Sequence, residues 1–203
     1  RAHFMRAKAK LLDQIIVPSK IMGDMLIKNG LPAEKIQHLP YGIDTARIIR
    51  RTTRGDQPKL RVGYTGTLYE HKGVHILIQA VRSLPADVPI ELKIHGKIAE
   101  FPDYVASLRE LIAGDPRITL CGPYTNSQID DILGHMDVLV CPSLWYENTP
   151  LVIYEAMAAG VPAIASNLGG MAESIEENVN GLLFPAGDVQ ALANHLKSVG
   201  EPL

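Results

Sequence analysis

Glu147 and Glu155 are two carboxylates separated by seven residues, and the segment between them contains Thr149-Pro150 at the start of an apolar run. Thr149 is a suitable helix cap and Pro150 suits a first helical turn, so we predict a helix over residues 150–159. The free amides of a first turn, together with the helix dipole, form an anion site that suits a phosphate. Glu147 precedes this helix, and Glu155 should lie about two turns along it. Carboxylates accept hydrogen bonds from hydroxyl pairs, so the arrangement fits a molecule with sugars on both sides of a diphosphate.

Both carboxylates also have a simpler interpretation. Glu147 could be a solvated loop residue, and Glu155 could lie on the solvent-facing side of a helix. The neighbours of Glu155, such as Val152, Ile153 and Ala156, are apolar. A carboxylate in such surroundings should not be buried without a partner, which favours the ligand site.

Lys72 is the second candidate, because it precedes Gly73 at the expected start of a helix. A cation at a helix N-terminus opposes the helix dipole, and a bound diphosphate would remove that conflict. A single lysine is more often an ordinary surface residue. We expect Lys72 to lie on the same edge of the sheet as Glu147, however, and this favours a functional role.

The elements that would position these residues alternate between strands and helices. Apolar runs predict strands at 60–64, 90–94, 118–121, 138–141 and 162–165, and helical periodicity predicts helices at 75–83, 104–113, 126–133, 150–159, 171–176 and 189–199. This alternation predicts an α/β fold with a doubly wound parallel sheet. Ligands bind at the carboxyl ends of the strands in such sheets. Glycine and polar residues follow these ends, namely Gly66, Thr67, Gly96, Tyr124 and Glu147, although each glycine alone could simply form a tight turn.

The chain before this regular region divides into two parts. Residues 1–40 predict a helix over 1–12 with basic residues, strands at 14–17 and 36–39, and a helix at 20–28 that Ser19 caps and Asn29-Gly30 ends. They carry too little apolar area for a core of their own, so we predict that they are the end of a preceding domain. Residues 41–58 are polar and charged and predict a linker. Residues 59–203 then form the main domain.

Composition excludes several classes of function. The 203 residues are 46% hydrophobic and 21% charged, with a formal net charge of −2, which gives no basis for nucleic-acid binding. No apolar run approaches the roughly 20 residues of a membrane helix, and no secretory signal pattern opens the chain. Cys121 and Cys141 each end an apolar run outside any CxxC or zinc-binding spacing. We therefore predict two buried, reduced thiols and a cytoplasmic protein.

The spacing of Glu147 and Glu155 matches the E-x7-E motif of the group 1 retaining glycosyltransferases of GT-B fold, and the surrounding sequence resembles that family. The similar segments are Tyr41–Asp44, Gly63–Gly66 with Lys72-Gly73, Pro142-Ser143, and residues 147–151, 155–162, 166–173 and 180–185. The resemblance covers essentially the whole chain. It implies that residues 59–203 are the Rossmann-like C-terminal domain that binds a nucleotide-sugar donor, and that residues 1–40 are a short remnant of the N-terminal domain.

The resemblance also implies roles for the candidate residues. The carboxylate that matches Glu155 binds ribose hydroxyls, and the one that matches Glu147 contacts the donor sugar. Lys72 matches the lysine that neutralises the diphosphate leaving group, so Lys72 and Glu147 are the candidate catalytic residues. The family needs no metal ion, so we expect no metal and no other cofactor, with charge neutralised by cations and amides. The other donor-binding residues expected are Gly66, Thr67, Gly96, Tyr124, Asn148, Thr149 and Leu151.

Two features bear on activity. Many members carry an arginine directly after the glycine that matches Gly66, whereas this chain has Thr67, so stabilisation of the leaving group would depend more on Lys72 and the helix terminus. Most of the N-terminal domain, which supplies the acceptor site, is expected to lie outside this chain. We therefore predict a glycosyltransferase of polysaccharide biosynthesis, acting on a sugar or lipid-linked acceptor, whose isolated 203-residue chain binds the donor but transfers nothing.

Other functions remain open from the sequence. A nucleotide-sugar-binding module or an epimerase on the same fold would lack transferase activity, and an epimerase would not need the two spaced carboxylates. A phosphorylase would need a cofactor lysine and a basic phosphate site, and a phospho-receiver would need clustered acids at the strand ends; we find neither pattern. A basic helix such as Arg1–Leu12 is more often solvated than membrane-bound, but the full-length protein could work at a membrane surface.

Overall fold

The computed structural model describes residues 2–48 and 59–200. Residues 49–58 of the predicted linker, Arg1 of the predicted basic helix and residues 201–203 of the predicted main domain therefore lie outside the described residues.

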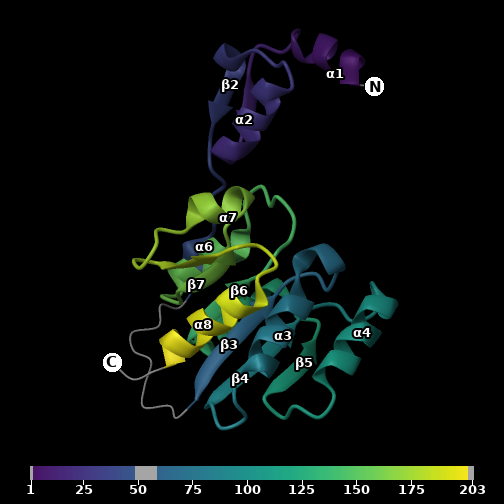
Figure 1. Cartoon of the computed structure of the whole chain (residues 1–203). Coiled ribbons are helices and arrows are strands. Elements are labelled where there is room, and N and C mark those ends of the chain that lie inside the picture. The colour runs from purple at the N-terminus through teal and green to yellow at the C-terminus, as the bar shows by residue number, and fades with distance from the viewer. Residues whose placement is uncertain (1, 49–58, 201–203) are drawn as a thin grey trace.

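Six parallel strands form the central sheet, in the order β5-β4-β3-β6-β7-β8 (Figure 1). The strands are β3 (Leu60–Thr65), β4 (Ile90–His95), β5 (Ile118–Gly122), β6 (Val138–Cys141), β7 (Ala163–Ser166) and β8 (Gly181–Phe184). The predicted doubly wound α/β fold is confirmed, because the chain first extends the sheet from β3 to β5 and then returns to the other side of β3 with β6. The strand β8 was not predicted, since its apolar run is only three residues long and begins after a glycine.

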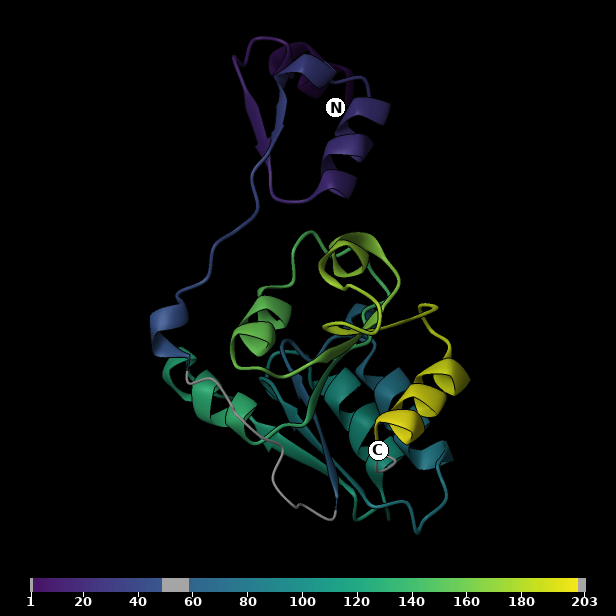
Figure 2. The ribbon, with the colours of Figure 1, turned by 90° about the vertical axis from the view of Figure 1, so that its left-hand side faces the viewer.

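Helices cover both faces of this sheet. One face packs against α3 (Val74–Ser83), α4 (Pro102–Ile112) and α8 (Val189–Gly200), and the other against α5 (Ile129–Gly134), α6 (Leu151–Ala158) and α7 (Gly169–Ser174), as Figures 1 and 2 show from two directions. Each face has its own hydrophobic cluster. The inner strands β3, β6 and β7 are therefore buried on both sides almost throughout, whereas β4 and β5 alternate between buried and more open positions.

The first 40 residues form a separate small unit beside α7 (Figure 1). It contains α1 (Ala2–Ala9), β1 (Ile15–Val17), α2 (Lys20–Lys28) and β2 (Ile36–His38), and its two strands pair in parallel with each other rather than with the central sheet. Ser19 caps α2 as predicted, because its hydroxyl accepts a hydrogen bond from the Met22 amide at 3.4 Å. The prediction that the first helix continues to Leu12 was wrong, since α1 ends at Ala9.

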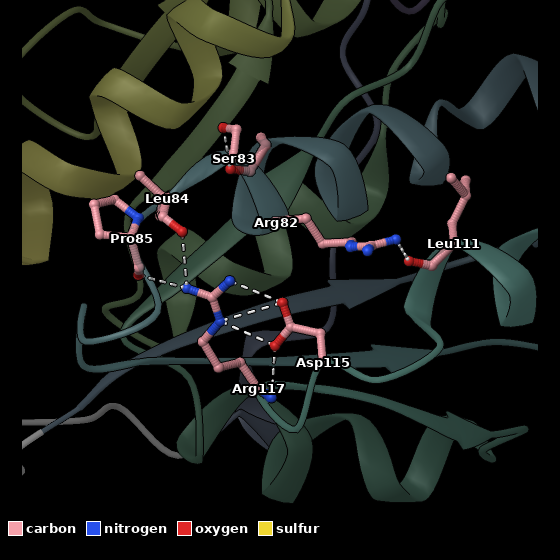
Figure 3. Close-up of polar contacts among 8 residues, drawn as sticks. Arg82, Ser83, Leu84, Pro85, Leu111, Asp115 and Arg117 are labelled. Carbon is pink, nitrogen blue, oxygen red and sulfur yellow. Dashed lines mark hydrogen bonds and ion pairs between the residues drawn. The ribbon is translucent and has the colours of Figure 1, made fainter.

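A polar cluster fastens the connections at the amino edge of the sheet, opposite the strand ends that carry the candidate residues (Figure 3). The Arg117 guanidinium donates to the Asp115 carboxylate at 2.8 Å and to the Pro85 carbonyl at 2.9 Å. The hydrogen bonds from Arg117 lower the pKa of the Asp115 carboxyl. This cluster holds the turn after α3 against the turn after α4, so it stabilises the scaffold rather than a ligand site.

The two cysteines do not share one environment, which corrects the prediction of two buried thiols. Cys141 is buried on the central strand β6, and burial raises the pKa of its thiol to about 12. Cys121 is exposed because β5 is an edge strand of the sheet, with Thr119 and Cys121 on its open face. Both thiols are free. A short apolar run therefore failed to distinguish an edge strand from a central one.

The buried Asp137 yields a test of the fold. Its carboxylate accepts hydrogen bonds from the Arg61 amide at 2.8 Å and from the Arg61 guanidinium at 3.0 Å, which ties β3 to the start of β6. We expect Asp137→Asn to lower the free energy of unfolding by about 1.5–3 kcal/mol, because hydrogen bonds to a buried charge are lost. The matched control is Glu91→Gln, whose pair with Lys93 is long, at 3.9 Å, and half exposed; it should change stability by less than about 0.5 kcal/mol. Urea denaturation of both variants measures the difference, and equal losses would contradict the assignment.

Candidate functional site

The central feature of the site is an ion pair at the point where the sheet reverses its strand order. Lys72 ends a short 3-10 helix, η3 (Glu70–Lys72), in the connection after β3, and Glu147 lies in the connection after β6. The Nζ atom of Lys72 is 2.6 Å from Oε1 of Glu147, and the side chains are 29% and 17% exposed. The structure thus brings the two predicted catalytic residues into direct contact, at the crevice where doubly wound sheets bind ligands.

Ser143 completes this contact, and the sequence analysis did not assign it a role. Its hydroxyl lies 2.8 Å from Glu147 Oε1 and 3.1 Å from the His71 carbonyl oxygen, to both of which it can donate. Ser143 is almost fully buried at the end of β6. Ser143 follows the end of β6, which is the kind of position from which the other candidate residues were chosen. Its position in the sequence could therefore have identified it.

The start of α6 differs from the prediction. The helix begins at Leu151, its N-cap is Pro150, and no side chain caps its amides. Thr149 is therefore not the cap; its hydroxyl instead donates to the Pro18 carbonyl at 3.3 Å. Leu151 is 43% exposed. The uncapped first turn of α6 leaves backbone amides free for an anion.

Glu155 lies on α6 facing a cavity of about 530 Å³. It is the fifth residue of the helix, which places it about one turn from the N-terminus rather than the predicted two turns. The cavity is lined by Gly42, Ile43, Asp44, Ile48, Asn126, Ser127, Ile129, Asp130, Leu151 and Glu155. Glu155 is half-buried there, and it has a polar interaction in the structure. The segment 42–48, within the predicted linker, thus closes one side of the pocket that holds the second carboxylate.

The glycine turns at the carboxyl ends of β3 and β4 lie side by side. The Gly66 amide donates to the His95 carbonyl at 3.1 Å, and the Gly96 amide donates to the Gly122 carbonyl at 2.9 Å. Thr67 is exposed beside Gly66, and its carbonyl accepts a hydrogen bond from the Tyr64 hydroxyl at 2.8 Å. These turns are therefore held by the backbone, and the Thr67 side chain brings no charge to the site.

Tyr124 follows β5 and packs against His95, with 6.2 Å between the ring centroids. Burial raises the pKa of its hydroxyl, and the negative charge of Glu155 raises it further. Burial also lowers the pKa of His95, and the charge of Lys93 adds to this effect. Both rings are therefore neutral near neutral pH. They meet edge to face, at 86°, and form an uncharged aromatic corner close to Glu155.

The small N-terminal unit contacts the rim of the site through Ser19. The Ser19 hydroxyl donates to the Asn148 side chain at 2.8 Å. The Glu173 carboxylate on α7 accepts hydrogen bonds from the backbone amides of Lys20 at 2.8 Å and Ile21 at 2.5 Å, at the N-terminus of α2. This role of Glu173 was not predicted from the sequence. The Ser19 contact thus joins the small N-terminal unit to the loop that carries Glu147, and the Glu173 contacts join it to α7.

Among residues 2–48 and 59–200, no group of three or more His, Cys, Asp or Glu side chains is arranged to hold a metal ion. Within the same residues, no helix has the length and apolar character required to cross a bilayer.

Comparison with known proteins gives a consistent family. The family model described as "Glycosyl transferases group 1" matches residues 59–201. The amylovoran biosynthesis glycosyltransferase AmsK of Erwinia amylovora is 34% identical over 191 residues, which are 89% of this chain and 46% of that protein. The D-inositol 3-phosphate glycosyltransferase of Corynebacterium urealyticum is 32% identical over 173 residues, or 81% and 41% of the two chains. The chain spans about half the length of the curated relatives it matches.

Solved structures agree with this result. Anabaena Alr3699/HepE in complex with UDP and glucose aligns with a TM-score of 0.83 and 26% identity, covering 98% of this chain and 57% of that one. A sucrose-phosphate synthase from Thermosynechococcus elongatus aligns with a TM-score of 0.81 and 26% identity, covering 95% and 51%. The similarity therefore includes the small N-terminal unit as well as the central sheet.

Gly170 gives a test of how the Glu147 loop is held. Its amide donates to the Glu147 carbonyl at 2.7 Å, and a Cβ atom at this position would lie 1.8 Å from the Asn148 carbonyl oxygen. We expect Gly170→Ala to push the loop away and to lower the free energy of unfolding by about 1–3 kcal/mol. The control Gly134→Ala adds its methyl group to open space at the end of α5, and it should leave stability unchanged or raise it by up to about 1 kcal/mol. Urea denaturation compares them, and equal stability would contradict the close approach.

Proposed function

The chain belongs to the group 1 glycosyltransferases, and from this premise we propose that residues 59–203 bind a nucleotide-diphosphate sugar, which the whole protein uses as the donor in retaining transfer of a sugar to an acceptor. The observation that carries the proposal is the contact between Lys72 and Glu147 at the strand-order reversal. It joins a cation suited to a diphosphate with a carboxylate suited to sugar hydroxyls, at the N-terminal side of α6.

Each residue then has a defined role. Lys72 and the free amides at the start of α6 neutralise the diphosphate, which takes the electron pair when its bond to the anomeric carbon of the sugar breaks. Glu147 accepts hydrogen bonds from the hexose, and Ser143 orients that carboxylate. Glu155 accepts the ribose hydroxyls in its cavity. The remaining contacts come from Gly66, Thr67, Gly96, Tyr124, Asn148, Thr149 and Leu151, with Tyr124 beside the ribose because of its closeness to Glu155.

The relatives suggest the first ligands and the biological setting. Alr3699/HepE was crystallised with UDP and glucose and with UDP-glucose, so UDP-glucose is the donor that we would test first. AmsK acts in amylovoran biosynthesis, which supports a role for the whole protein in making a polysaccharide. The free, exposed thiol of Cys121 suits a reducing compartment such as the cytoplasm. No metal ion or other cofactor takes part in the proposed reaction.

The epimerase interpretation has less support. The curated relatives named above are glycosyltransferases, and an epimerase has no need for two carboxylates on either side of a diphosphate site. A module that binds the nucleotide sugar without transfer would show the same ligand profile as the donor domain. The two interpretations differ only in whether the whole protein transfers the sugar, and the glycosyltransferase family of the chain favours transfer.

Three substitutions should produce three ligand profiles. Glu155→Gln should weaken the nucleoside, its diphosphate and the nucleotide sugar alike, by about ten- to a hundredfold, because a charge-assisted hydrogen bond of about 1.5–3 kcal/mol is lost. Lys72→Ala should weaken the diphosphate and the nucleotide sugar but not the nucleoside. Glu147→Gln should weaken only the nucleotide sugar. Calorimetric titration of uridine, UDP and UDP-glucose measures all three profiles.

The controls replace matching residues away from the site. Lys197→Ala on α8 and Glu110→Gln on α4 change exposed side chains, so they should leave every affinity unchanged. The effect of Lys72→Ala should also shrink as salt increases, because the site is partly exposed. One common loss for all three ligands in all three site variants would point to a fold defect and refute the donor site.

A transfer assay tests whether sugar transfer requires an acceptor-side domain in addition to this chain. We expect the 203-residue chain to bind the donor weakly and to transfer no sugar, because closing the site and excluding water need a second domain. Release of UDP from UDP-glucose in the presence of candidate acceptors is the measurement. Rapid, acceptor-dependent release by this chain alone would show that no further domain is required.

A further inference from the structure

A row of four aromatic rings runs across the surface towards the Lys72–Glu147 pair. The ring centroids of Phe101 and Tyr69 are 4.3 Å apart, those of Tyr69 and His71 are 4.8 Å apart, and those of His71 and Trp145 are 6.1 Å apart. The rings come from the start of α4, from η3 and from the loop after β6. Segments distant in sequence therefore combine to form one continuous aromatic surface.

The row is exposed rather than part of the core. Tyr69 is 39% exposed and Trp145 is 63% exposed, while Phe101 and His71 are half-buried. The loops that carry His71 and Trp145 are joined to each other, because the Leu144 amide donates to the His71 carbonyl at 2.8 Å. Loops joined in this way lose less conformational entropy when a ligand binds to their exposed aromatic rings.

A cavity of about 600 Å³ adjoins the far end of the row, between α3 and α4, which lie side by side (Figure 1). Tyr69 and Phe101 belong to both the row and the cavity wall, and three carboxylates, Glu70, Glu100 and Asp103, line the same cavity. The described residues that line it include no lysine or arginine. Burial lowers the pKa of His75, so this ring is neutral at neutral pH. The cavity is therefore acidic and unsuited to a phosphate or a second nucleotide.

Aromatic faces combined with carboxylates match the surface of a neutral sugar. The C–H groups on one face of a pyranose ring pack on an aromatic ring, whose face is electron-rich. Its hydroxyls donate to carboxylate oxygens in charge-assisted hydrogen bonds. A basic peptide could also pack on aromatic rings and acids. Continuity favours the sugar, because the row ends at His71 and Trp145, next to Lys72 and close to Glu147.

We propose that the aromatic row and the acidic cavity bind a neutral oligosaccharide, so that this chain itself holds part of the acceptor glycan beside the donor. The binding site follows from the rings and carboxylates alone. Its role as an acceptor site rests on the proposed function, since it requires that the sugar is transferred at the Lys72–Glu147 pair. The cavity then holds the glycan several residues away from the end that receives the new sugar.

Trp145 makes the proposal directly measurable, because it is the one tryptophan in the sequence. Its fluorescence should change saturably when the chain is titrated with neutral hexasaccharides of glucose, galactose or mannose, with a dissociation constant in the roughly millimolar range for at least one of them. Absence of a saturable change with all three sugars would overturn the proposal. A stronger response to a lysine-rich peptide than to any of the sugars would overturn it in favour of a protein partner.

Variants locate the binding. Tyr69→Ala and Asp103→Asn should each weaken saccharide binding by about fivefold or more, which is the loss of one stacking or hydrogen-bonding contact. Tyr69→Phe keeps the ring and should bind within about twofold of the unmodified chain, because stacking needs only the ring face. Tyr146→Ala is the matched control, since Tyr146 is 55% exposed next to Trp145 but makes no ring contact within the row.

The outcomes separate this proposal from the donor site. Tyr69→Ala should leave UDP-glucose affinity unchanged, whereas Glu155→Gln should weaken UDP-glucose and leave the saccharide unaffected. If Tyr69→Ala does not fold, Asp103→Asn decides alone, because Asp103 is exposed in the first turn of α4. An equal loss in Tyr146→Ala and Tyr69→Ala would overturn the assignment to the row. Failure of saccharide binding with intact UDP-glucose binding would overturn this proposal and leave the donor site standing.

Discussion

The candidate site depends on how closely the loop after β3 approaches the loop after β6. A Cβ atom at Gly73 would lie 1.9 Å from the Pro142 carbonyl oxygen, and the glycine also has φ of 68°, so no other residue fits there without displacing the backbone. Around this contact, the His71 carbonyl accepts hydrogen bonds from Ser143 and Leu144. Lys72 lies between Gly73 and His71, so its backbone is fixed beside the loop after β6. One close backbone approach thus positions the cation, the serine that orients the carboxylate, and the His71–Trp145 end of the aromatic row.

The second constraint is the attachment of the first 40 residues to the opposite rim. Ser19 binds the Asn148 side chain, and Glu173 binds the amides at the start of α2. The free amides of that helix end attract a carboxylate for the same reason that the start of α6 suits a phosphate. These hydrogen bonds resemble the polar contacts found between domains of one chain. The loop with Glu147 is therefore held on one side by the sheet and on the other by the Ser19–Asn148 hydrogen bond.

The sequence predicted the doubly wound parallel sheet and the placement of Lys72 and Glu147 on one edge of it, because both follow from local patterns. Apolar runs located five of the six strands, and the edge rule for parallel sheets brought Lys72 and Glu147 together before their contact was known. Features that depend on contacts between distant segments could not be predicted from such local patterns. The exposure of Cys121 depends on which strand is at the edge of the sheet, and the Thr149 hydroxyl binds the distant Pro18 carbonyl instead of capping its own helix. The aromatic row also escaped the sequence analysis, since its rings come from segments without any shared periodicity.

The Lys72–Glu147 pair also shapes how the proposed donor would be recognised. Lys72 precedes the N-terminus of α3, where a cation is unfavourable, and the Glu147 carboxylate offsets this. Thr67 supplies no second charge, so a diphosphate must compete with Glu147 for the same lysine. Every ligand with a diphosphate must break the contact between Lys72 and Glu147, which costs free energy. Only a complete nucleotide sugar then offers its sugar hydroxyls to the Glu147 carboxylate. A bare nucleoside diphosphate leaves Glu147 with Ser143 alone. In the proposed function the pair would therefore favour the intact donor over its product, which is the discrimination that a transferase needs in order to release the spent nucleotide.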